Sequence, residues 1–211
     1  MLFSKPKSKL EPAVLKALFD QQVRTLVDKG YHGLLNLSEA DFRAKLDSLW
    51  QRNISKVEDY YFSKDREIPF LVVVKAGDAR KSLELAGART ELDLTQIKNK
   101  EETPQADIYL LLDVEDGREE VAKSPAESLK RFSKKGRRPL TLNESLALLV
   151  HQPEILKDHY VISAGTFIPK NNAELPLIWL LDDDNSPELH YAWFDIAHGH
   201  YGSASCALRL H

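Results

Sequence analysis

Two short apolar runs most strongly limit what this chain of 211 residues can fold into. The first, IPFLVVV at residues 68–74, contains three consecutive valines, and the second, DIYLLLDVEDG at residues 107–117, contains three consecutive leucines. Runs of this length without polar alternation are typical of strands that are buried on both faces. The sequence therefore predicts two central strands.

Residues 12–56 predict a helical part with one buried side. Pro12 suits the first turn of a helix, and apolar residues at helical spacing follow it as far as Gly30, which predicts the stop. Ser38 predicts the start of a second helix, because its hydroxyl can cap the free amide groups of the first turn. A run of apolar residues on one face of this second helix completes a helical pair.

The middle of the chain alternates further helices with the apolar runs. The predicted helices are residues 78–87 with Asp78 as the cap, residues 124–136 with the capping box of Ser124 and Glu127, and a helix ended by Pro153 that opens with Thr141 and Glu144. Between the runs, TELDL at residues 90–94 predicts a minor strand.

From about residue 158 the pattern changes to strands, the last of them SASCALRL at residues 203–210. The fold class predicted is α/β or α+β, with N-terminal helices packed on a mixed sheet that ends in an antiparallel C-terminal meander. Residues 1–11 are polar and basic and predict a flexible N-terminal tail. Residues 12–211 predict a single domain, with its helical part at residues 12–56.

Composition excludes some classes of function. The net charge is −3, which gives no overall attraction to nucleic acid or to anionic lipid. No apolar run approaches the length of about 18 residues that a membrane span needs, and no apolar stretch follows the N-terminal lysines as in a secretory signal. One cysteine forms no internal disulfide, so the predicted compartment is the cytoplasm.

Sequence motifs for several reactions are missing, including the P-loop, the dinucleotide-binding glycine motif and the zinc-protease motif. In a strand over residues 203–210, alternation places Cys206 on a face with alanine and leucine, which predicts an inert buried thiol. The acidic turn of Asp182, Asp183 and Asp184 is typical of a hairpin, since the glycine and final glutamate of a calcium loop are missing.

The residues KRFSKKGRR at positions 130–138 hold six cations in nine positions. One interpretation is a nucleic-acid patch. The interpretation we favour is the end of a surface helix, where cations complement the negative end of the helix dipole.

The chain's last segment, FDIAHGHYGSASCALRLH, gathers the residues that we predict as a binding site. His198, His200, Tyr201, Ser203 and Ser205 offer imidazoles and hydroxyls on a loop held by strands, the usual way in which proteins present binding groups. Arg209 shares the predicted serine face and adds a charge for an anionic ligand. The sequence does not decide whether the two imidazoles converge, so a metal site stays open as an alternative.

Several segments together resemble an uncharacterised bacterial protein family, catalogued as a domain of unknown function. They include QQVRTLVDKGYHGLLNLSEADFRAKL, YLLLDVEDGRE, KGRRPLTLNESLALLVHQPEIL and the closing GSASCALRL, and they span the chain from about residue 20. The resemblance implies one domain of this family, and it carries over no activity, cofactor or catalytic residue to this chain.

The sequence predicts an uncharacterised cytosolic protein that binds a small ligand or a protein partner without catalysis. The sequence leaves the cofactor unknown. The alternative is a hydrolase-type enzyme that uses His198 or His200 as a general base or as a ligand of a metal. A third hypothesis, nucleic-acid binding through residues 130–138, is disfavoured by the helix-end interpretation.

Overall fold

A computed structural model describes residues 7–63, 68–75, 77, 79–169, 173–181 and 184–211. Its described helices are α1 (Pro12–Asp28), α2 (Glu39–Glu58), α3 (Ala79–Leu85), α4 (Pro125–Lys135) and α5 (Leu142–His151), with the 3-10 turns η1 (Tyr31–Leu35), η2 (Leu94–Gln96), η3 (Arg118–Glu120) and η4 (Pro153–Lys157). The mixture of helices with several small sheets confirms the predicted α+β class.

The strands form two principal sheets and three two-stranded pairs. The described strands are β1 (Lys7–Ser8), β2 (Phe62–Ser63), β3 (Phe70–Val74), β4 (Lys98–Asn99), β5 (Ile108–Leu112), β6 (Arg138–Pro139), β7 (Tyr160–Ile162), β8 (Thr166–Phe167), β9 (Glu174–Leu180), β10 (Pro187–Trp193), β11 (Tyr201–Ser203), β12 (Ser205–Cys206) and β13 (Leu208–Leu210).

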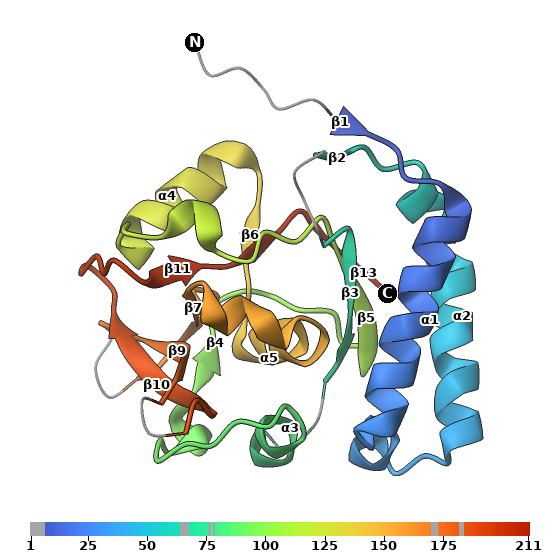
Figure 1. The fold of residues 1–211 in the computed structure, drawn as a ribbon, viewed down its shortest axis with the longest axis horizontal. Coiled ribbons are helices and arrows are strands. Elements are labelled where there is room, and N and C mark those ends of the chain that lie inside the picture. The colour runs from blue at the N-terminus through green and yellow to red at the C-terminus, as the bar shows by residue number, and fades with distance from the viewer. Residues whose placement is uncertain (1–6, 64–67, 76, 78, 170–172, 182–183) are drawn as a thin grey trace.

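The first principal sheet, in the order β13-β5-β3, is the centre of the molecule. Every residue of β3 and β5 is buried, as the two apolar runs predict. Figure 1 shows α1 and α2 on one side of this sheet and α5 on the other, so helices cover both faces. A buried side chain also closes the open edge of β3: Gln22 on α1 donates to the carbonyl of Phe70 and accepts from the amide of Val72.

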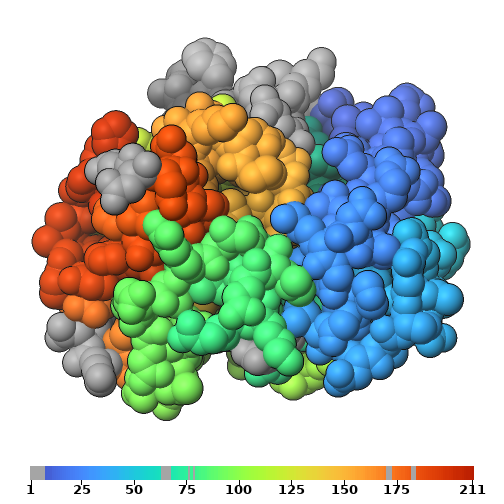
Figure 2. Space-filling model, turned by 60° about the horizontal axis from the view of Figure 1, so that its bottom comes forward, coloured from blue at the N-terminus to red at the C-terminus, as the bar shows by residue number. Residues whose placement is uncertain are grey.

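The second principal sheet, in the order β10-β9-β7-β11, lies at the opposite end of the molecule from α1 and α2 (Figures 1 and 2). Its inner face joins the main core through Val161, Ile178 and Leu189. Its outer face carries a second apolar cluster, against which Leu129 of α4 packs. β7, β9 and β10 are antiparallel neighbours, as the predicted meander requires, whereas β11 joins β7 in parallel.

The predicted helix signals are confirmed where they fall on described residues. Ser38 accepts a hydrogen bond from the amide of Asp41, and Ser124 forms its capping box with Glu127. The helix that begins at Ala79 follows the prediction, but its predicted cap, Asp78, lies outside the described residues.

Two strand predictions are wrong. Residues 90–94 form no strand, because the hydroxyl of Thr90 bonds the carbonyl of Leu189 and the amide of Leu92, and Asp93 then caps η2. Residues 203–210 are not one strand either: the chain passes from β11 to β12 to β13 and changes its partner strand each time. The alternation predicted across Ala207 is therefore lost, and Leu208 is exposed.

In the described part of the chain, no helix combines the length and the apolar character needed to cross a membrane.

Candidate functional site

The outer face of the second sheet carries a row of large side chains, one from each strand. Tyr201 on β11 lies opposite Tyr160 on β7, and Trp179 on β9 lies opposite Glu188 on β10. Val161 pairs with Ile178, so Tyr160 and Trp179 are the next neighbours across the sheet, and their ring centroids are 6.4 Å apart. Tyr201, Tyr160, Trp179 and Glu188 are half-buried, which leaves part of each available to a ligand.

Three histidine rings extend this row: His190 on β10, and His198 and His200 on the loop before β11. His190 lies beside Trp179 with ring centroids 4.9 Å apart, and His198 stacks on Tyr201 at 3.9 Å. The ring centroid of His200 lies 6.4 Å from that of Tyr160. We call this surface the aromatic platform, which consists of Tyr160, Trp179, His190, His198, His200 and Tyr201.

Backbone hydrogen bonds hold the loop against the sheet. The amide of Tyr160 donates to the carbonyl of His200, and the amide of Tyr201 donates to the carbonyl of His198. A further bond, from the amide of Ala122 to the carbonyl of His198, ties the loop to the segment before α4. The exposed imidazoles are thus carried on a fixed backbone, which lowers the entropy cost of binding a ligand.

The two histidines of the loop lie close together, and a backbone hydrogen bond occupies one ring nitrogen of His198. Their ring centroids are 6.0 Å apart, and Nδ1 of His198 accepts a hydrogen bond from the amide of His200 at 3.3 Å. This bond leaves Nε2 of the neutral ring of His198 as the donor. Within the described residues, no group of three or more histidine, cysteine or acidic side chains could hold a metal ion.

Trp179 has a fixed hydrogen-bond partner on the platform, and Tyr201 keeps its proton there. Nε1 of Trp179 donates to Glu188 at 2.8 Å, which fixes the indole ring and places a carboxylate at the edge of the platform. Burial, and then the neighbouring Tyr160, raise the pKa of Tyr201, so its hydroxyl keeps its proton. With Glu188, the platform thus combines ring faces with hydroxyl and imidazole donors and one carboxylate acceptor.

The structure brings three of the six predicted site residues together on the platform, namely His198, His200 and Tyr201. Ser203 points to the same face two residues farther along β11, but only 1% of it is exposed and its hydroxyl has no hydrogen-bond partner in the described part of the chain. Ser203 therefore lies behind the platform and does not reach solvent.

Ser205 belongs to a separate buried ion network. Its hydroxyl accepts from Nε of Arg137 at 2.8 Å and donates to Glu115 at 3.2 Å. Nη1 of Arg137 also donates to the Asp113 carboxylate, and Nη2 donates to the carbonyls of Asp113 and Ser205. This network fastens β12 to the end of β5 and to the segment after α4, so we assign Ser205 a structural role.

Arg209 belongs to a second ion network, in which an internal carboxylate pairs with the charge that the sequence predicts for a ligand. Its guanidinium donates to both oxygens of Glu144, at 2.6 and 2.9 Å, and to the carbonyl of Pro139. Glu144 is fully buried and also accepts from Tyr109 and from the amide of Thr141. Burial alone would lower the pKa of Arg209, but the bonds to Glu144 raise it above its ordinary value.

Cys206 is fully buried in the main core, as the sequence predicts. Burial raises the pKa of its thiol to about 12. A thiol with this pKa stays protonated near neutral pH and is therefore a poor nucleophile.

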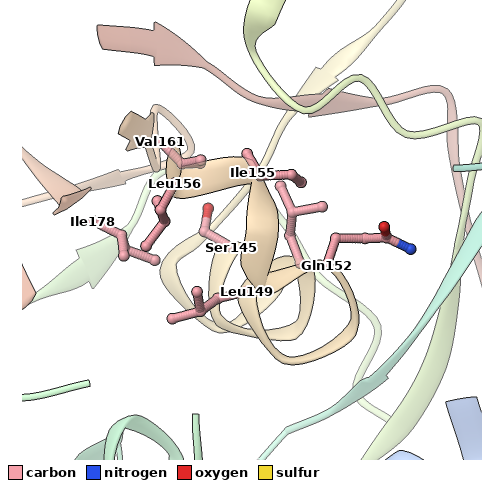
Figure 3. Close-up of a pocket in the computed structure, with 8 residues that line it drawn as sticks. Ser145, Leu149, Gln152, Ile155, Leu156, Val161 and Ile178 are labelled. Carbon is pink, nitrogen blue, oxygen red and sulfur yellow. The ribbon is translucent and has the colours of Figure 1, made fainter. Parts of the chain in front are cut away.

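A cavity beneath α5 is too small to compete with the platform as a ligand site. Figure 3 shows its lining side chains, which come from α5, η4, β7 and β9 and include Ser145, Leu149, Leu156 and Val161. Its volume of about 10 Å³ is at the lower limit for one water molecule, and its lining is almost entirely apolar.

Sequence reasoning missed Tyr160, Trp179 and Glu188 as site residues, and considered His190 only as a third metal ligand. For Tyr160 and Trp179 the available signal was an aromatic residue beside or within an apolar run, as in HYVIS and LIWLL. That signal locates single residues only. Their alignment into a row depends on the register between strands, which the residues themselves do not display.

The model of one protein family, described as a family of unknown function, matches residues 25–211. Neither the curated proteins nor the solved structures contain a match to this chain. The family match covers most of the chain and confirms the resemblance noted in the sequence, whereas a bacterial origin stays a prediction. The chain therefore belongs to the family of unknown function DUF5701.

Proposed function

We propose that this protein is a non-catalytic binding domain that holds a small, ring-bearing ligand on the aromatic platform. The observation that carries the proposal is the row of half-exposed rings on β11, β7 and β9, which Glu188 and His190 continue onto β10. Tyrosine and tryptophan supply large, rigid contact areas, and stacked aromatic pairs contribute about 0.5–1.5 kcal/mol beyond the area that they bury.

The charges on the platform favour a ligand without phosphate groups. The six residues of the platform include no lysine or arginine, and Glu188 places a negative charge at its edge. Phosphate-rich ligands depend on contacts with cations, so a nucleic acid gains little here. A neutral ring, with polar groups at its rim that reach Glu188 or the tyrosine hydroxyls, fits the surface better.

The burial of the nearby nucleophiles supports binding without catalysis. The alternative, a hydrolase that uses His198 or His200, needs a nucleophile or a metal within reach of an imidazole. Ser203 and Ser205 are 1% and 0% exposed, and Cys206 is protonated and buried. We also propose the cytoplasm as the compartment, since a single buried thiol has no need of an oxidising environment.

Saturation-transfer NMR with a library of ring-bearing fragments tests the proposal. The wild type should transfer magnetisation to a subset of fragments, and the double variant Tyr160→Ala/Trp179→Ala should lose those signals while it stays folded. The variant Tyr61→Ala is the matched control, because Tyr61 is an exposed aromatic residue that is not part of the platform. Hits that persist in the double variant, or an absence of hits in the wild type, would contradict the proposal.

A further inference from the structure

The basic segment at residues 130–138 divides into two groups in the structure. Four of its six cations lie close to carboxylates: Arg131 with Glu120, Lys135 with Glu119, Arg137 with Asp113 and Glu115, and Arg138 with Glu101. Lys130 and Lys134 have no ion-pair partner among the described residues. The one acid of the first turn of α4, Glu127, bonds the amide and hydroxyl of Ser124 and lies near enough to Lys130 to feel its charge.

These two lysines line the same open groove. They lie one helical turn apart on the exposed side of α4, where residues i and i+4 are neighbours. The groove runs between α4 and the turn after β10, and its apolar lining consists of Ala126, Leu129 and Phe194. Its polar lining is Lys130, Lys134, Ser133 and Asp195, so the groove carries a net positive charge.

A third cation lies beside the groove's phenylalanine. Nζ of Lys100 lies 5.6 Å from the ring centroid of Phe194 and 5.0 Å from that of Phe167. Phe194 and Leu129 are half-buried, so part of each apolar side chain stays accessible in the groove. Apolar side chains left accessible in a groove are typical of an interaction surface.

From this arrangement we propose that the groove beside α4 binds an acidic amphipathic helix of a partner protein. Leucine-like side chains of the partner lie on Leu129 and Phe194, and carboxylates one turn apart on the partner face Lys130 and Lys134. A helix in an apolar groove with complementary charges is a common mode of recognition. This proposal goes beyond the proposed ligand site, because none of the lining residues belongs to the aromatic platform.

Fluorescence anisotropy with a designed probe tests the proposal on the full chain. The probe is a fluorescein-labelled helical peptide of leucine, alanine and glutamate, with a leucine stripe and flanking glutamates four residues apart. A second peptide has lysine in place of each glutamate. The acidic peptide should bind with an affinity that falls as salt is raised, and the basic peptide should not bind.

Charge-reversal variants locate the binding on the protein. Lys130→Glu/Lys134→Glu should weaken binding of the acidic peptide by at least about tenfold. Arg52→Glu/Lys56→Glu is the matched control, because it makes the same change in charge at the same spacing on the exposed face of α2. Phe194→Ala should also weaken binding, since it removes an apolar side chain from the groove.

Four results would overturn the proposal: no binding of the acidic peptide with a Kd below about 1 mM, equal binding of both peptides, equal losses in the two double variants, or lysine-dependent binding to vesicles of anionic lipid without binding of the peptide. The last result would identify the groove as a membrane-contacting surface.

Discussion

The two principal sheets of this protein differ in how completely they are covered. In the sheet β13-β5-β3, helices pack on both faces and every residue of β3 and β5 is buried. In the sheet β10-β9-β7-β11, the inner face is buried, but Tyr160, Trp179 and Tyr201 stay half-exposed on the outer face. The first sheet therefore contributes mainly to stability, and the second retains surface for binding.

The largest expected effect concerns the ion network around Arg209, which joins β13 of the first sheet to α5 and β6. Arg209→Met should lower the free energy of unfolding by about 3–5 kcal/mol, because it leaves the fully buried Glu144 carboxylate without its cation. Urea denaturation followed by circular dichroism measures the change. The double variant Arg209→Met/Glu144→Leu should recover part of the loss, and a loss below about 1 kcal/mol in the single variant would refute the structural role of Arg209.

A comparison of two tryptophans tests the difference in packing between the two sheets, since Trp50 of α2 packs against Phe70 of β3 and Trp179 lies on β9. Trp50 is fully buried, stacked on Phe19 with its ring centroid 4.6 Å away, whereas Trp179 is half-buried on the platform. Trp50→Ala should cost about 3–5 kcal/mol of unfolding free energy, and Trp179→Ala about 1–2 kcal/mol. Equal losses in urea denaturation would show that the platform is as closely packed as the core.

Part of the pH dependence of stability should originate at His151, which contacts β3 of the first sheet. Burial lowers the pKa of His151 to about 4, and Nε2 of its ring bonds the carbonyl of Val72 at 3.1 Å. The unfolded chain takes up this proton below about pH 6.5 and the folded chain only near pH 4. The folded state should therefore lose about 1–3 kcal/mol of stability from this group as the pH falls through that range.

The variant His151→Gln isolates this contribution, because its amide can keep the bond to Val72 but does not titrate. Unfolding free energies measured between pH 7 and pH 4 should fall less in the variant than in the wild type. Identical pH profiles would show that His151 does not differ in pKa between the folded and unfolded chains.

The smallest expected effect concerns the cavity between α5 and the sheet β10-β9-β7-β11. The hydroxyl of Ser145 is buried at this cavity without a hydrogen-bond partner among the described residues. Ser145→Ala should therefore raise the free energy of unfolding by about 0.5–1 kcal/mol, since it removes an unsatisfied polar group with little change in volume. A loss of stability measured by thermal unfolding would indicate that the hydroxyl bonds a water molecule there.

The parts of the fold that depend on local chemistry could be predicted from the sequence. Ser38 and Ser124 mark helix starts because capping involves residues only three positions apart. The strands at residues 70–74 and 108–112 could be located because a fully apolar run leaves few alternatives. The burial of Cys206 was also predicted correctly, although the strand alternation used to predict it is interrupted at Ala207.

The parts that depend on distant partners could not be predicted. The strand predicted over residues 203–210 is divided because successive parts of it pair with three different strands, β7, β6 and β5. That division separates Arg209 from Ser203 and places its guanidinium against Glu144, which is 65 residues away in the chain. The row through Tyr160 and Trp179 was missed for the same reason, since it exists only after the sheet has formed.

A two-dimensional nitrogen–proton NMR titration of the wild type with a ring-bearing fragment most directly tests whether the aromatic platform binds a ligand. The chain has three tryptophans, and the indole N–H of Trp179 reports on the platform through its bond to Glu188. We expect a saturable shift of this signal and of the Tyr160 and Tyr201 amides, with the Trp50 indole signal unchanged. Saturable shifts confined to another surface, with the Trp179 signal unmoved, would contradict the assignment of the platform as the binding site.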